Sequence, residues 1–121
     1  MVETPSPQAD GLSVTLGLRG TWITVEVIGE LDFATRSVLD EQLEEVVARR
    51  GLPHVALDLS RLSFCDSSGL SALIGARKRV HAAGGELLLL NPRPRLIELL
   101  RITGLDRLFT VHDILPEPPT G

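Results

Sequence analysis

The sequence has a single cysteine, no tyrosine and one tryptophan, and aromatic residues make up 3% of its 121 residues. Cys65 has no second thiol to pair with, which excludes an internal disulfide and a cysteine-based metal site and is typical of a reducing compartment. The sequence also has no excess of positive charge, because 12 Lys and Arg residues against 16 Asp and Glu residues give a formal net charge of -4. A broad basic surface that would release counterions from nucleic acid is therefore excluded.

Long apolar runs are missing as well. The longest aliphatic run, residues 87–90, is far shorter than the roughly 18 residues that a membrane span needs, and residues 1–11 lack the basic and apolar regions of an export signal. We therefore expect a cytoplasmic protein that binds neither nucleic acid nor a membrane.

The length predicts one domain, since 121 residues with 43% hydrophobic content can bury one core but not two. Proline and polar residues at 1–10 predict a flexible leader, residues 11–115 the folded domain, and residues 116–121 (PEPPTG) a disordered tail.

Strand and helix patterns alternate along the domain, which predicts an α/β fold with a mixed sheet of four or five strands covered by helices. Apolar alternation and aliphatic runs predict strands at residues 12–18, 22–28, 55–60, 86–90 and 108–111. Amphipathic patterns predict helices at about residues 32–50, 67–83 and 94–102. We expect GELD, residues 29–32, to end the second strand and Asp32 to be the N-cap of the first helix.

The stretch FCDSSGLSALIGARKRV, residues 64–80, has an unusually small open helix face. At about 100° per residue, the side expected to face the core holds Leu70, Leu73, Arg77 and Val80. The opposite side holds Ser67, Ser71, Gly75, Lys78 and Arg79. A surface without tall side chains allows another protein to approach closely, with Ile74 as an apolar anchor. For Asp66 alone, ordinary helix capping is the better interpretation.

Ser67 and Ser68 lie at a helix N-terminus, where free N–H groups and the helix dipole favour an anion. A phosphate here would carry about -1.5 to -2 charges and should leave the helix intact. A partner that had buried a hydroxyl would then have to desolvate a dianion. The position therefore suits a switch that changes binding and spares the fold.

From residue 12 to residue 112, three segments in order resemble the STAS domains of bacterial anti-sigma factor antagonists. These segments are GELD, then VALDLSRLSFCDSSGLSALIGARKRV, then GGELLLLNPRPRLIELLRITGLDRLF. DSSGL with a preceding LSF, a downstream GGE and a later TGL makes the resemblance specific. It implies a single STAS domain that, when unmodified, binds an anti-sigma factor with serine kinase activity and so releases a sigma factor.

The resemblance also implies that this kinase phosphorylates Ser67 and that a PP2C-type phosphatase reverses the modification. The kinase holds the ATP, so the chain itself is expected to need no cofactor and no metal. Asp32, in the GELD segment, is expected near the phosphorylation site and in the kinase contact. The surroundings of the switch are expected to be Asp32, Asp66, Ser68 and Gly69. The partner-binding surface is expected to be Ser71, Ile74, Gly75 and Lys78.

An enzyme is the less favoured interpretation, because a hydrolase would need a base beside Ser67 or Ser68. No motif supports any of the three histidines in that role, and a GxSxG elbow is absent. Cys65 is expected to be a small buried hydrophobe instead of a reactive thiol. The alternative function is a STAS subunit that supports a transporter or a sensory complex, with Ser67 never modified. Co-purification with a kinase or with a membrane assembly would separate the two.

Overall fold

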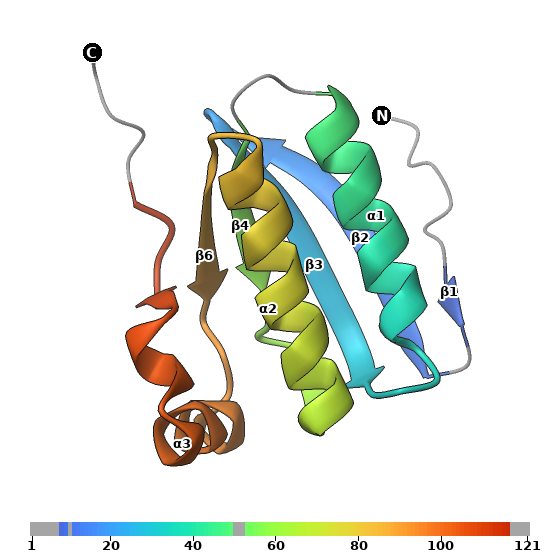
Figure 1. Cartoon of the computed structure of the whole chain (residues 1–121), viewed down its shortest axis with the longest axis vertical. Coiled ribbons are helices and arrows are strands. Elements are labelled where there is room, and N and C mark those ends of the chain that lie inside the picture. The colour runs from blue at the N-terminus through green and yellow to red at the C-terminus, as the bar shows by residue number, and fades with distance from the viewer. Residues whose placement is uncertain (1–7, 10, 50–52, 117–121) are drawn as a thin grey trace.

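The computed structural model describes residues 8–9, 11–49 and 53–116, which form an α/β fold. Two helices lie side by side on one face of a twisted sheet, and a third helix crosses one end of it (Figure 1). The strands are β1 Gln8–Ala9, β2 Leu12–Arg19, β3 Trp22–Leu31, β4 His54–Asp58, β5 Leu62–Cys65, β6 Glu86–Leu90 and β7 Thr110–His112. The helices are α1 Arg36–Arg49, α2 Ser67–Ala82, α3 Pro94–Thr103 and the 3-10 turn η1 Leu105–Arg107.

The strands form one mixed sheet, as predicted, in the order β1-β2-β3-β4-β6-β7, with β5 paired to the far end of β3. The β1–β2 and β2–β3 pairs are antiparallel and the remaining pairs are parallel. The described part of the chain thus has seven strands, more than the four or five predicted. The additional strands are β1, two residues within the segment predicted as a leader, and β5, four residues of which two are exposed. Neither is long enough to show a periodic pattern.

The second strand was predicted to end at residue 28, but β3 continues through Gly29 and Glu30 and ends at Leu31, within GELD. β3 pairs with β4 as far as Glu26 and with β5 from Gly29 on, and the register of the β3–β5 pair shifts between Gly29 and Glu30. Gly29 has φ 111°, a conformation that glycine adopts without strain. The Gly29 N–H donates to the Arg61 carbonyl at 3.1 Å and the Glu30 N–H to the Gly11 carbonyl at 2.7 Å. A local bend therefore replaces a strand end.

The main core lies between the sheet and the helices α1 and α2. The amphipathic pattern of this segment predicts a buried stripe of Val38, Leu39, Leu43, Val46 and Val47; the first four are buried in the core and Val47 is partly buried against it. Residues 87–90 of β6 are all buried, as expected of a strand covered on both faces. On the other face of the sheet, Trp22, Ala56, Leu88 and Leu90 form a smaller cluster under Leu115.

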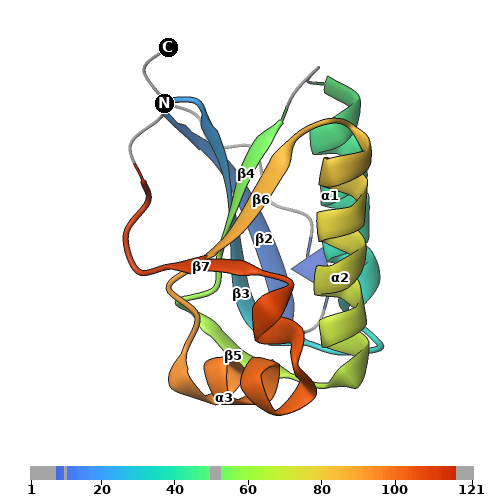
Figure 2. The same ribbon diagram turned by 60° about the vertical axis from the view of Figure 1, so that its left-hand side comes forward.

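The C-terminal segment crosses this second face (Figure 2). The Trp22 Nε1–H donates to the Pro116 carbonyl at 3.1 Å. Within the described residues, no helix combines the length and the apolar content of a membrane span.

Candidate functional site

The start of α2 lies at the end of the molecule that also carries β5 and α3 (Figure 2). Asp66 is the N-cap of α2, as predicted, because its Oδ1 accepts the Gly69 N–H at 2.9 Å and its carbonyl accepts the Leu70 N–H at 2.9 Å. Ser67 is the first helical residue and is exposed, whereas Ser68 is half-buried. Among the described residues, the Ser67 hydroxyl has no hydrogen-bond partner. Its oxygen is therefore accessible to a visiting protein.

Gly69 holds the first turn of α2 close to the end of β3. It is buried, and a Cβ at this position would meet the Leu31 carbonyl oxygen and would lie 2.7 Å from the Cys65 Sγ. The Asp66 N–H also points to the Leu31 carbonyl, at 3.4 Å. Gly69 thus belongs to the surroundings of Ser67, as expected, and its contribution is close packing.

Asp32 is not the N-cap of α1, which begins four residues later at Arg36. Its Oδ1 instead accepts the N–H groups of Ala34 and Thr35, both at 3.0 Å, and lies 3.1 Å from the Thr35 hydroxyl. That hydroxyl donates to the Glu30 carbonyl at 2.8 Å and accepts the Asp32 N–H at 3.0 Å. Asp32 therefore organises the turn between β3 and α1.

Thr35, only 2% exposed, is the residue of this turn that the sequence reasoning missed. The aspartate itself is the signal that the sequence offers for this turn, because an Asp side chain commonly accepts a backbone N–H two residues on, as Asp32 does from Ala34.

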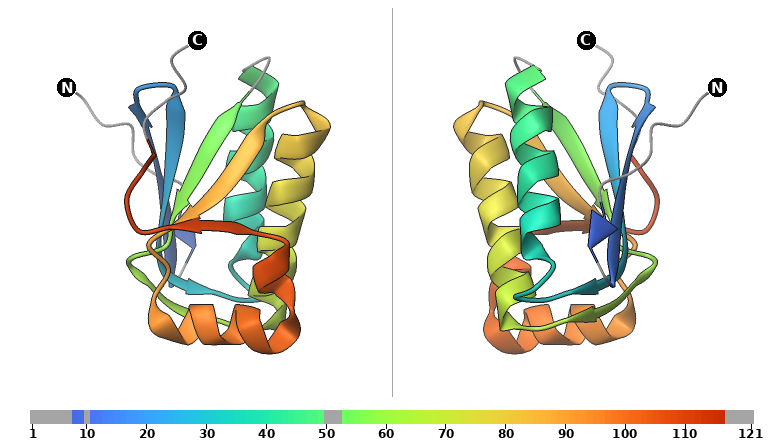
Figure 3. Two further views of the ribbon diagram at one scale, coloured as in Figure 1. Left: turned by 90° about the vertical axis from the view of Figure 1, so that its left-hand side faces the viewer. Right: turned by 90° about the vertical axis from the view of Figure 1, so that its right-hand side faces the viewer.

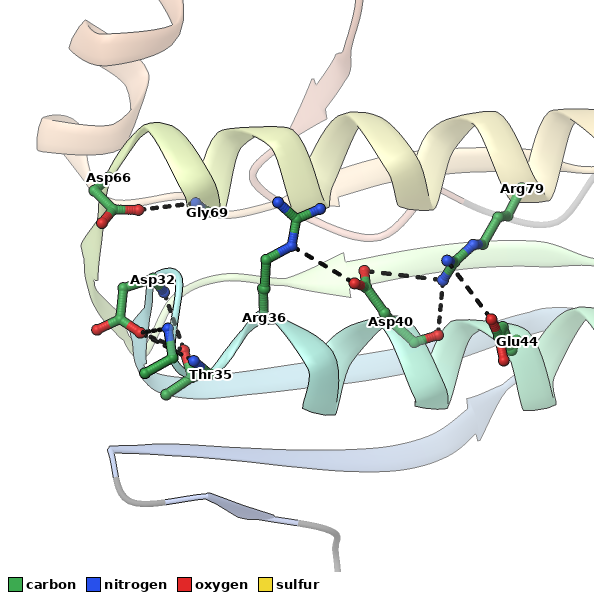
Figure 4. A network of polar contacts seen from close by, with 9 residues as sticks. Asp32, Thr35, Arg36, Asp40, Glu44, Asp66, Gly69 and Arg79 are labelled. Atoms are coloured by element: carbon green, nitrogen blue, oxygen red, sulfur yellow. Dashed lines mark hydrogen bonds and ion pairs between the residues drawn. The ribbon is translucent and has the colours of Figure 1, made fainter.

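Asp32 and Asp66 lie together at the same end of the fold. Leu31 and Cys65 are register partners in the parallel β3–β5 pair, so the residues that follow them leave the sheet side by side (Figure 4). Each carboxylate uses its Oδ1 for a local turn or cap. Within the described part of the chain, neither Oδ2 has a partner. Ser67 therefore directly follows one of two neighbouring carboxylates, and each of these carboxylates has one oxygen free for a cation.

The open face of α2 is smaller than predicted. Ser71 and Lys78 are exposed, Gly75 is half-exposed, and a Cβ on Gly75 would meet no atom within 4 Å. Ile74 is half-buried and packs partly against the core, so only part of its side chain is available as an anchor.

Arg79 does not belong to the open face, because it binds α1. Its Nη1 donates to the Asp40 carbonyl at 2.8 Å and lies 3.8 Å from the Asp40 carboxylate, and its Nη2 lies 3.6 Å from the Glu44 carboxylate (Figure 4). The prediction of Arg77 as a core residue was also wrong, since it is half-exposed, while Ala72 and Ala76 are buried in the core. The open face thus consists of Ser67, Ser71, Gly75 and Lys78.

Cys65 is half-buried beside this site. Burial, with a smaller contribution from the Asp66 carboxylate, raises the pKa of its thiol to about 12. A protonated thiol is a poor nucleophile. In the described residues, no group of three or more potential ligands is placed to hold a metal.

Comparisons of the sequence and of the fold with known proteins identify similar proteins of one kind. The sequence pattern of the STAS domain matches residues 14–117. An anti-sigma F factor antagonist of Paenibacillus polymyxa is 36% identical over 95 residues, which are 78% of this chain and 80% of that protein. An anti-sigma-B factor antagonist of Bacillus subtilis (strain 168) is 37% identical over 89 residues, 74% of this chain and 80% of that protein. The crystal structure of an anti-sigma factor antagonist from Mycobacterium paratuberculosis matches with a TM-score of 0.76 and 26% identity, covering 93% of this chain and 92% of that one.

Substitution of the two glycines of α2 by alanine should change the free energy of unfolding in opposite directions. Gly69→Ala should lower the free energy of unfolding by about 1–3 kcal/mol, because its Cβ would overlap the Leu31 carbonyl. Gly75→Ala, the matched control, should raise it by about 0.5–1 kcal/mol, because the space is open and alanine favours a helix. Urea unfolding curves measure both changes. Equal stabilities of the two variants would show that the first turn of α2 is not packed against β3.

Cys65 should be slow to react with a thiol reagent while the protein is folded. Its raised pKa of about 12, against an ordinary value of 9.0, keeps the thiol protonated at pH 8. It also means that the stabilising contribution of the neutral thiol is complete below pH 9 and is lost as the pH rises toward 12. Labelling with a disulfide reagent at pH 8, with and without urea, checks this, and Cys65→Ser is the blank. Equal rates in the two conditions would disprove the assignment.

Proposed function

The chain belongs to the STAS domain family, and on that premise we propose that it is an anti-sigma factor antagonist that works by partner switching. Unmodified, it binds an anti-sigma factor that is also a serine kinase, and a sigma factor is released. Phosphorylation of Ser67 ends this binding. The observation that carries the proposal is the exposed Ser67 hydroxyl without a hydrogen-bond partner in the described structure, at the first position of α2. The similarity to two anti-sigma factor antagonists over about three quarters of the chain supports it.

Ser67 is a better phosphoryl acceptor than Ser68 because it is exposed, and than Ser71 because it is the first residue of α2. Ser68 is half-buried, and Ser71 lies one turn further along α2, away from the two carboxylates. In the proposed reaction the Ser67 oxygen takes the γ-phosphoryl group of ATP held by the kinase, ADP leaves, and the hydroxyl proton passes to a base of the kinase. The chain contributes the acceptor and its positioning, so we propose no catalytic role, cofactor or metal for it. A PP2C-type phosphatase restores the hydroxyl by hydrolysis.

The charges around Ser67 explain why a phosphate would change binding. The dianion would add about -1.5 to -2 charges to a chain whose net charge is already -4. The Gly69 N–H is already used by Asp66, so fewer amides remain to neutralise the phosphate than an uncapped helix would offer. The positive end of the α2 dipole still favours it. The helix therefore tolerates the phosphate, while a partner would have to desolvate it beside two carboxylates.

The rest of the proposed contact surface follows α2 and the β3–α1 turn. Ser71, Gly75 and Lys78 present a low surface on which a partner helix or loop can lie closely. The free Oδ2 of Asp32 offers a carboxylate to a cation of the kinase. We place this activity in the cytoplasm, where ATP-dependent kinases act and a free Cys65 thiol is stable.

Ser67→Ala should accept no phosphate when the protein is incubated with its kinase and ATP. Ser68→Ala, which keeps the exposed hydroxyl, is the matched control and should accept one phosphoryl group, as should the unaltered protein. Intact-protein mass spectrometry counts the added groups. Modification that persists in Ser67→Ala would move the site to another residue.

Phosphorylation should reduce the affinity for the anti-sigma factor and leave the fold intact. We expect Kd to rise at least about a hundredfold, because a dianion without a partner charge would be buried in the interface. The melting temperature should change by no more than about 4 °C. Calorimetric titration and thermal melting measure the two quantities, and Ser67→Ala treated with ATP should bind like the unmodified protein. A large fall in melting temperature would mean that the switch acts by unfolding.

A further inference from the structure

A groove of about 680 Å3 lies between β5 and the start of α3. Both elements lie at the same end of the molecule as the first turn of α2 (Figure 3). The apolar lining comes from Leu62 and Phe64 of β5 and from Leu96 and Leu99 of α3. Arg93 and Arg95, at the start of α3, add two cations. The proposed phosphorylation of Ser67 uses none of these side chains.

Phe64 is 49% exposed, although it follows the buried Leu62 by only two residues. Aromatic side chains that remain exposed inside a groove are typical anchors of protein interfaces. Leu96, in contrast, is 6% exposed and belongs to the core. The groove therefore has a fixed apolar wall on α3 and an accessible aromatic ring on β5.

The two arginines give the groove a charge opposite to that of the whole chain. The Arg93 Nε–H donates to the Ser60 carbonyl at 3.0 Å, which orients the guanidinium and leaves its terminal nitrogens free. Neither Arg93 nor Arg95 is paired with a carboxylate of the described residues. On a chain with a net charge of -4, this local positive charge favours an acidic partner and selects against a basic one.

We propose that this groove is a second docking site for the anti-sigma factor, and that it receives a segment carrying an apolar side chain flanked by carboxylates. The proposal rests on the proposed function. Cys65 lines the groove, and the next residue, Asp66, caps α2, so one bound protein can contact both the groove and Ser67. The apolar side chain packs on Phe64 and Leu99, and the carboxylates pair with Arg93 and Arg95.

Phosphate on Ser67 should weaken binding of the anti-sigma factor at the β5–α3 groove as well as at α2. A phosphate on Ser67 is two residues from Cys65 and brings negative charge next to the acidic segment in the groove. Repulsion between them adds to the desolvation of the phosphate itself. The groove thus supplies part of the affinity that phosphorylation removes.

The test is to change the groove without changing Ser67. Phe64→Ala should weaken binding of the purified anti-sigma factor kinase about tenfold. The double variant Arg93→Glu with Arg95→Glu should weaken it at least as much and should reduce its dependence on salt. The double variant Arg93→Lys with Arg95→Lys should bind more tightly than the glutamate pair, because the charge is retained. Calorimetric titration at two salt concentrations measures these effects.

Matched controls are available on the β2–β3 hairpin, at the opposite end of the molecule (Figure 3). Leu18 is 63% exposed and Arg19 is exposed, so Leu18→Ala and Arg19→Glu remove the same kinds of group from another surface. Both should leave Kd unchanged. Circular dichroism checks that every variant is folded.

The outcomes separate this inference from the proposed function. If the unaltered protein binds the kinase, Ser67→Asp abolishes binding and the groove variants bind normally, the docking proposal is overturned and the proposed function stands. If the groove variants alter only self-association, measured by sedimentation, the groove belongs to a second copy and the proposal is likewise overturned. If the unaltered protein binds no anti-sigma factor, the proposed function fails first.

Discussion

The structure depends most on how the first turn of α2 is held against the end of β3. The Asp66 carboxylate caps the Gly69 N–H, and Gly69, lacking a Cβ, lies against the Leu31 carbonyl. This packing directs Leu70 and Leu73 into the core and leaves Ser67 in solvent. A larger residue at position 69 would lift the turn from the sheet, and the serine would lose its fixed place beside Asp32 and Asp66. The Ser67 hydroxyl is therefore exposed because Gly69 packs closely against the backbone of Leu31.

At this end of the fold, the residue proposed to be phosphorylated and the side chains proposed to contact the partner are different groups. In the proposed switch, phosphate would be added at a single position on α2, where the helix dipole favours an anion and nearby carboxylates would disfavour burial of that anion in an interface. The rest of the open face of α2, Ser71, Gly75 and Lys78, and the β5–α3 groove would supply the contacts, and a phosphate on Ser67 would alter none of these side chains chemically. Arg79 connects α1 and α2 through Asp40 and Glu44, about three turns away from Ser67 along α2. Such an arrangement lets modification change affinity at little cost to stability.

The sequence predicted what local periodicity and capping determine. The α/β class, the three helices and the Asp66 cap follow from side-chain spacing along one element. The errors concern contacts between elements. Gly29 bends β3 because β4 and β5 pair with it at different offsets, which no local pattern reveals. Arg79 is on the expected side of α2 for its backbone, yet its long side chain reaches α1. β5 is too short and too exposed to show the two-residue period of a strand. The groove that β5 forms with α3 could therefore not be predicted from the sequence.

The most direct test of the account compares backbone amide spectra of the protein with and without phosphate on Ser67. Nuclear magnetic resonance of the labelled chain reports each amide separately. If the phosphate changes only the surface, the shifted signals will be confined to the β3–α1 turn, the end of β5 and the first two turns of α2. Shifts or loss of protection spread through the buried strands β4 and β6 would show that phosphorylation rearranges the core, and would contradict the account.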